Sequence, residues 1–145
     1  MRPNMSAEVQ DRIQQEVEQA TTMTTRFKDT RQEYQRMHDR SISEAALQKS
    51  LIEVAEMHGW KVHHETDSRR SNPGLPDLIC AHPNHGVVFI ELKSERGYLK
   101  PAQREWRDAL VMAGANYYVF RPRDRFIADA LFTSGDMPAM TDFAK

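Results

Sequence analysis

The first part of the chain carries a narrow stripe of apolar residues. From about residue 6 to residue 37 they recur mostly at steps of three or four, with one gap near Thr30 and Arg31, and this spacing predicts a helix. The threonine cluster at 21–25 is weak helix-forming sequence and predicts a kink or break. The arm is predicted either to pack on its own domain or to dimerise, with disorder of its first part as a third alternative. The stripe consists of Val9, Ile13, Val17, Ala20, Met23, Phe27, Tyr34 and Met37.

A second amphipathic helix is predicted from about residue 43 to residue 58, after a polar joint at 38–41. Gly59 is placed to end it. Ser41 and Glu44 have the spacing of a capping box, in which the two residues satisfy each other's backbone N–H groups. Glu44 therefore has a purely structural explanation on this pattern alone.

After Gly59 the apolar residues form short runs and alternating stretches, which are typical of strands. The expected order of elements is α, α, β, β, β, α, β, α, an α/β layout with a small sheet covered by helices. We expect a helical arm at 1–40, a globular domain at 41–133 and a loose tail at 134–145. The predicted strands are 60–65, 77–81, 87–92 and 116–120, and the predicted later helices are 101–112 and 126–132.

Three charged residues lie where two of these strands should meet. Asp77 begins one strand, and Glu91 and Lys93 lie two apart at the end of the next. Residues two apart in a strand share a face, so Leu92 should point the other way into a core. Carboxylate oxygens are the ligands that Mg²⁺ prefers, and the pattern predicts a metal-dependent phosphodiester hydrolase. The alternative is a structural ion pair between Glu91 and Lys93.

Composition places the chain among single-domain proteins. It has 145 residues, 39% of them hydrophobic, one cysteine (Cys80) and a formal net charge of −1. No apolar run is long enough to span a bilayer and no signal peptide is visible, so we expect a soluble intracellular protein. No P-loop or dinucleotide fingerprint is present, and no small-molecule substrate is expected. The acidic excess lies at the two ends, whereas residues 61–125 are net positive, which permits a nucleic-acid partner.

Candidate phosphate contacts lie on either side of the charged trio. Arg69 and Arg70 occupy a polar loop, where they clamp phosphate or are merely solvated. Lys100 and Arg104 flank the start of the helix at 101–112, and helix N-termini favour phosphate. Gln103, in the same turn, either points into the site or only satisfies backbone at the third helical position.

These residues together resemble a known family. Gly74-Leu-Pro-Asp77, then Glu91-Leu-Lys93, then Gln103 on the next helix, is similar to the PD-(D/E)xK nuclease pattern, and more narrowly to the virus-type replication-repair nuclease (VRR-NUC) domain. The resemblance spans about residues 43 to 120 and does not cover the N-terminal arm. It implies a restriction-endonuclease-like fold, with a mixed four-stranded sheet flanked by helices.

The resemblance also implies roles for individual residues. Asp77, Glu91 and the main-chain carbonyl of Leu92 would bind Mg²⁺, with Mn²⁺ as a substitute and Glu44 as a further candidate ligand. Lys93 would orient the attacking water and stabilise charge on the phosphorane. Glu44 matches an acidic residue on the family's first core helix, and Gln103 matches a polar residue that supports the site.

We therefore expect a Mg²⁺-dependent, structure-selective DNA endonuclease. Small stand-alone members of the family resemble phage proteins, which would place the chain in a host cytoplasm, and some are homodimeric Holliday-junction resolvases. A homodimer that cuts branched DNA is the leading hypothesis. A monomeric flap or end-processing repair nuclease is the second. The non-enzyme alternative is a DNA-binding module whose Asp77, Glu91 and Lys93 form a structural ion-pair cluster.

Overall fold

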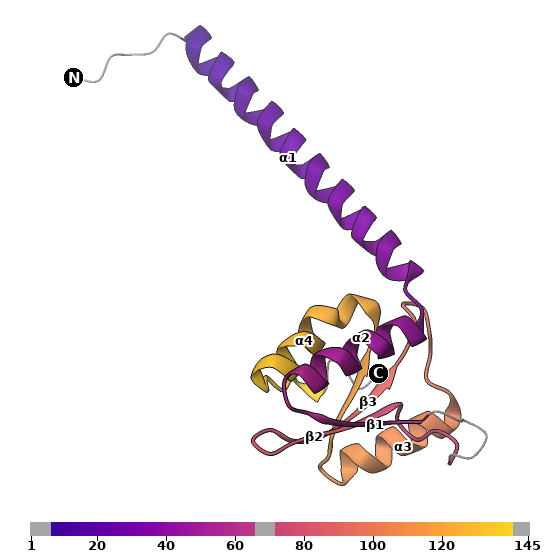
Figure 1. Cartoon of the computed structure of the whole chain (residues 1–145). Coiled ribbons are helices and arrows are strands. Elements are labelled where there is room, and N and C mark those ends of the chain that lie inside the picture. The colour runs from indigo at the N-terminus through magenta and orange to yellow at the C-terminus, as the bar shows by residue number, and fades with distance from the viewer. Residues whose placement is uncertain (1–6, 66–71, 141–145) are drawn as a thin grey trace. The chain divides into compact units, whose positions relative to one another are not determined.

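The computed structural model describes residues 7–65 and 72–140. Arg69 and Arg70, the predicted phosphate-binding pair, lie outside the described residues. The chain divides into two compact units, Met1–His38 and Asp39–Lys145. Each unit is described by itself, and Figure 1 labels the helices α1 to α4 and the strands β1 to β3.

Helix α1, Ala7–Ser41, supplies every described residue of the first unit. The break predicted at 21–25 is wrong, because α1 runs through the threonines without interruption. Their hydroxyls donate to carbonyl oxygens four residues earlier, at 2.8 to 3.0 Å, so the side chains are satisfied within the helix. The polar joint predicted at 38–41 is also wrong, since α1 continues to Ser41.

The apolar stripe of α1 is exposed to solvent. Phe27 and Tyr34 are 71% and 73% exposed, and the only buried residue described in α1 is Asp39. No helix in the described part of the chain is both long and apolar enough to cross a membrane.

The second unit is built on a four-stranded sheet in the order β1-β2-β3-β4. Three antiparallel neighbours, β1 (Lys61–His64), β2 (Leu78–His82) and β3 (Gly86–Leu92), are followed by β4 (Asn116–Phe120), which runs parallel to β3. The parallel pairing requires a crossover, and helix α3 (Pro101–Met112) supplies it. β3 is a central strand, as its nearly continuous apolar sequence predicts.

Helices cover both faces of this sheet (Figure 1). α2 (Glu44–Met57) and α4 (Arg125–Ser134) lie on one face, and α3 lies on the other. A short 3₁₀ helix, Pro122–Asp124, leads into α4. The predicted α/β class is confirmed, with its mixed four-stranded sheet, flanking helices and additional N-terminal helix.

Two apolar clusters fill the space between these layers. The larger one joins α2 and α4 to the sheet and includes Leu51, Ile90 and Leu92, all at most 1% exposed. The smaller one lies under α3 and includes Tyr117 and Val119. The sheet is therefore buried on both faces around β3, so a charged side chain in that strand has little access to water.

The beginning of α2 corrects the capping prediction. Ser43, not Ser41, is the N-cap, and its hydroxyl accepts the Ala46 N–H at 3.1 Å. Glu44 is the first helical residue and points its carboxylate at another segment, where Oε1 accepts the Ser94 N–H at 3.0 Å. The reciprocal cap between Ser41 and Glu44 is therefore wrong, and Glu44 is free of that structural duty.

Candidate active site

The strand register brings Asp77 and Glu91 together. Ile90 and Leu92 belong to the core cluster under α2 and α4, so alternation sends Glu91 to the opposite face of β3. Asp77 immediately precedes β2, and the antiparallel register that pairs Leu78 with Ile90 continues to place Asp77 opposite Glu91. The two strands pair as the sequence predicts, and both carboxylates lie on the α3 face of the sheet.

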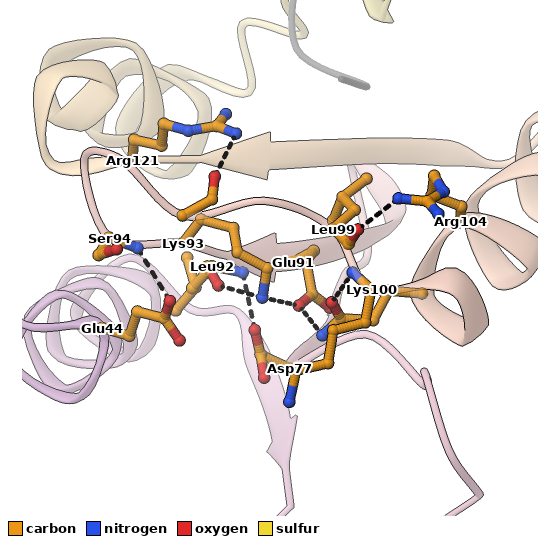
Figure 2. Close-up of polar contacts among 12 residues, drawn as sticks. Glu44, Asp77, Glu91, Leu92, Lys93, Ser94, Leu99, Lys100, Arg104 and Arg121 are labelled. Carbon is orange, nitrogen blue, oxygen red and sulfur yellow. Dashed lines mark hydrogen bonds and ion pairs between the residues drawn. The ribbon is translucent and has the colours of Figure 1, made fainter.

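Hydrogen bonds fix the three charged residues in place (Figure 2). Asp77 Oδ2 accepts the Leu92 N–H at 2.7 Å, which ties the end of β3 to the start of β2. Lys93 Nζ donates to Glu91 Oε1 at 2.5 Å and to the Leu92 carbonyl at 3.1 Å. The ammonium therefore neutralises one oxygen of Glu91 and lies beside the main-chain carbonyl that was expected to bind metal.

Gln103 joins the helix to the same carboxylate. Its Oε1 accepts the Lys100 N–H at 2.8 Å, and its Nε2 donates to Glu91 Oε1 at 2.5 Å. The two alternatives considered for Gln103 thus occur together: the side chain caps the start of α3 and also reaches the site. Because the backbone orients the amide, its donor end is held toward Glu91.

Glu91 has one oxygen left without a partner. The residue is fully buried, and Oε2 makes no hydrogen bond with the described residues. Burial, and next the charge of Asp77, raise the pKa of Glu91 from 4.5 to about 7, although Lys93 opposes the shift. An ionised carboxylate in such a place is stabilised by a further positive charge on its free oxygen.

Asp77 and Glu44 extend this electrostatic cluster. Burial raises the pKa of Asp77, and the Leu92 N–H and Lys93 oppose that rise. The Glu44 carboxylate contributes to the raised pKa of both Asp77 and Glu91. The carboxylates of Asp77 and Glu44 therefore disfavour ionisation of Glu91, and Lys93 is the cation that opposes them.

A cleft of about 360 Å³ opens onto Asp77 and Gln103. Gly74 lines it with φ of +84°, and a Cβ at this position would lie 2.3 Å from the Ala102 carbonyl. Only glycine lets this loop approach the first turn of α3 so closely. The Gly74-Leu-Pro-Asp77 segment thus places Asp77 in the wall of a cleft that is also lined by the first turn of α3.

The cleft contains a residue that the sequence reading missed. Glu65 lies just after β1 and lines the cleft with Asp77. The register that pairs His63 with Ile79 continues to place Glu65 opposite Asp77. The alternation of apolar and polar residues along 60–65 predicts a strand, but the sequence does not show with which strand it pairs.

The basic residues around the loop at 94–100 either line the cleft or contact the loop itself. Lys100 lines the cleft, as a phosphate contact would. Arg104 Nη1 instead donates to the Leu99 carbonyl at 2.7 Å, and Arg121 Nη2 donates to the Gly97 carbonyl at 3.0 Å (Figure 2). Arg123 pairs with Glu95 at 3.0 Å. These contacts brace the loop, and sequence gave no reason to assign that role to Arg121 or Arg123.

The donor set fits a hard divalent cation. No three His, Cys, Asp or Glu side chains within residues 7–65 and 72–140 lie close enough to form a metal cluster by themselves. The site instead offers two adjacent carboxylates, one with a buried unpartnered oxygen, and a main-chain carbonyl. Oxygen ligands with remaining positions for water or phosphate are the usual environment of Mg²⁺.

Comparison with known proteins gives two concordant matches. A family model described as the VRR-NUC domain matches residues 5–124. A solved structure described as a VRR_NUC domain is 28% identical, covers 63% of this chain and 95% of its own, and superposes with a TM-score of 0.51. Comparison with curated proteins yields no match. The resemblance read from the sequence is confirmed, but the matched range is wider than 43–120, since it includes α1.

Proposed function

This chain belongs to the VRR-NUC domain family, and from that premise we propose that it is a Mg²⁺-dependent endonuclease selective for branched DNA. The family makes the chain a nuclease of the PD-(D/E)xK type that acts on DNA. The proposal adds the cation, the DNA structure and the residues. The observation that carries it is the buried Glu91 with an unpartnered oxygen, next to Asp77 in the wall of a cleft.

Each side chain of the site has a task in phosphodiester hydrolysis. Asp77, Glu91 and the Leu92 carbonyl would hold the cation, which would supply a nucleophilic hydroxide and neutralise charge on the phosphorane. Lys93, held by Glu91 and the Leu92 carbonyl, orients the attacking water and adds positive charge near the reacting phosphate. Gln103 keeps Glu91 in one orientation through its short hydrogen bond.

Glu44 acts on the cation site indirectly, without binding the cation itself. Its Oε1 is engaged with the Ser94 N–H, so it positions the residue that follows Lys93. Its charge also acts on Asp77 and Glu91. Lys100 contacts phosphate in the cleft, and Arg104 contributes mainly by bracing Leu99.

The branched substrate and the homodimer belong together in this proposal. Two symmetric incisions across a four-way junction need two active sites related by a two-fold axis. A flap or end-processing nuclease is the second candidate. It is favoured by the fact that Glu44, Asp77, Glu91, Lys93 and Gln103 all come from one compact unit of one chain.

A panel of synthetic DNAs tests the proposal. Duplex, flap, fork and four-way junction, each with every strand labelled in turn, are incubated with Mg²⁺, Mn²⁺ or EDTA. We expect paired cuts in the junction with either metal and none in EDTA. Cutting of the flap alone would establish the second candidate. Binding without cleavage in any metal would establish the DNA-binding module and overturn the enzyme assignment.

A further inference from the structure

Helix α1 exposes an apolar face to solvent, and this exposure is unfavourable unless another element packs against the face. Along its length the large residues Val9, Ile13, Met23, Phe27 and Tyr34 are between 44% and 73% exposed. Most of the stability of helices in proteins comes from packing of such a face against another element. The threonines of α1 are poor helix formers, which makes this packing more necessary.

We propose that α1 pairs with α1 of a second copy of this chain, in antiparallel orientation. This pairing rests on the proposed homodimer and supplies its interface. It commits to a register centred near Met23, in which the N-terminal half of each helix lies along the C-terminal half of the other.

The spacing of the stripe supports this register. From Ala20 to Met37 the steps alternate between three and four residues, as in a coiled-coil seam, if Thr30 is counted as a member. The Thr30 hydroxyl donates to the Arg26 carbonyl at 2.9 Å, so its polar group is satisfied and its methyl group is available for packing. Four-residue steps continue the stripe from Val17 back to Val9.

The antiparallel register matches the sizes of facing side chains. It opposes the small Ala20 to the large Phe27, and Val17 to Thr30, with Met23 near its own symmetry mate at the centre. Toward the ends it opposes Ile13 to Tyr34 and Val9 to Met37. Apart from Thr30, which is also exposed, every residue in these layers belongs to the exposed stripe.

Two charged residues on the stripe decide the orientation. Glu16 lies three residues after Ile13 and four before Ala20, and Arg31 lies four after Phe27 and three before Tyr34, so both are on the apolar face. Glu16 forms an exposed ion pair with Arg12 of its own helix, at 4.0 Å. In the antiparallel register Glu16 of one copy faces Arg31 of the other, twice. A parallel pair would set Glu16 against Glu16 and Arg31 against Arg31.

The distribution of charge along α1 also favours the antiparallel orientation. Its first half is acidic, and its second half is net positive. Opposite charge along facing helices steers both orientation and association. The acidic half also disfavours an anionic lipid surface or a DNA backbone as the occupant of this face. The charged residues are Glu8, Asp11, Arg12, Glu16 and Glu18 in the first half and Arg26, Lys28, Asp29, Arg31, Glu33, Arg36, Asp39 and Arg40 in the second.

Single engineered cysteines test the register in the full-length protein. Cys80 is the chain's only cysteine and is fully buried, so an added thiol on α1 is the accessible one. With a short bismaleimide crosslinker, we expect Met23→Cys to link to itself. Val9→Cys and Met37→Cys should not self-link, because antiparallel helices hold each residue about 40 Å from its own mate. A mixture of these two variants should link.

Efficient self-linking of Val9→Cys would overturn the antiparallel arrangement. Light scattering on the same samples separates the other failures. A dimer whose α1 cysteines never link would overturn the α1 pairing but leave the proposed homodimer in place, and a monomer would overturn both. None of these readings involves DNA or cleavage.

Charge exchange is the second measurement. Glu16→Arg and Arg31→Glu should each weaken the dimer by about tenfold, and the two together should restore it, because the facing pair is then re-formed with reversed signs. Failure of the double variant to recover would contradict the pairing of Glu16 with Arg31.

Discussion

The two units of this protein show opposite mismatches between residue type and surroundings. In the second unit a carboxylate, Glu91, is fully buried near the end of an apolar strand. In the first, Phe27 and Tyr34 on a single helix are mostly exposed. A buried charge and an exposed aromatic ring are both costly in isolation. In our proposals each mismatch is relieved by another species, a divalent cation in one case and a second helix in the other.

The two units also differ in what the structure shows directly and what has to be inferred. The residues of the candidate site in the second unit all come from one chain, so the structure gives their contacts and distances directly. The face of α1 is proposed to be half of an interface, and its partner is inferred from spacing and charge. Experiments that affect one unit and leave the other unchanged therefore test whether the candidate site and the α1 face have separate roles.

The largest effect is expected from removing the charge of the carboxylate of Asp77 or of Glu91. Asp77→Asn or Glu91→Gln should lower single-turnover DNA cleavage by about a thousandfold or more, since several kcal/mol of transition-state stabilisation depend on the cation they hold. DNA binding and the mass of the dimer should change little. Glu56→Gln, an exposed carboxylate on α2, is the matched control and should cleave normally. Wild-type rates in Asp77→Asn would refute the site.

The next largest effect is expected on assembly. Ile13→Asp combined with Phe27→Asp places two charges in the seam, and light scattering should show a monomer. The melting temperature of the nuclease unit should stay unchanged, and junction cleavage should shift from paired cuts to single nicks. Gln15→Asp with Thr22→Asp adds the same charges on the opposite side of α1 and should leave the dimer intact. Dimers in both variants would show that α1 is not the interface.

A smaller effect is expected at Glu44. Glu44→Gln should lower kcat by about tenfold to a hundredfold with KM nearly unchanged, as for residues that orient a metal site from outside. Ser43→Ala removes the helix cap next to it and should cost about 1 kcal/mol of stability without lowering kcat. The reverse pattern would mean that Glu44 serves the helix and not the site.

The smallest effect is a pH dependence of stability without divalent metal. The pKa of Glu91 is raised from 4.5 to about 7 in the folded state, so the folded protein binds this proton more tightly than the unfolded chain does. Its contribution is present below about 4.5 and is lost as pH rises toward 7. In EDTA the melting temperature should fall by several degrees across this window. Glu91→Gln should flatten the slope, and an unchanged slope would contradict this origin.

Local sequence signals account for much of the fold. Pro101 begins α3 and Gly114 follows its end, so the predicted bounds 101–112 agree with the structure. The unbroken apolar run of β3 predicts its central place, and Glu91 is conspicuous in it. The errors lie where several polar residues compete for one role. Ser41 and Ser43 are both acceptable caps, and only tertiary contacts decide that Glu44 faces Ser94.

Residues missed at the site depend on long-range pairing. Glu65 reaches the cleft through the register of β1 with β2, and Arg121 and Arg123 brace a loop that precedes them by more than twenty residues. No local pattern encodes such contacts. The threonines of α1 show the converse error, because low helix propensity was outweighed by their hydrogen bonds to the preceding turn.

The most direct test of the central claim is to measure Mn²⁺ binding to the DNA-free protein by electron paramagnetic resonance or calorimetry. The wild type and Glu56→Gln should bind Mn²⁺, and Mg²⁺ should compete for the same site. Asp77→Asn and Glu91→Gln should lose this binding while remaining folded by circular dichroism. Equal Mn²⁺ affinity in all four proteins would contradict the assignment of the Asp77–Glu91 pair as the metal site.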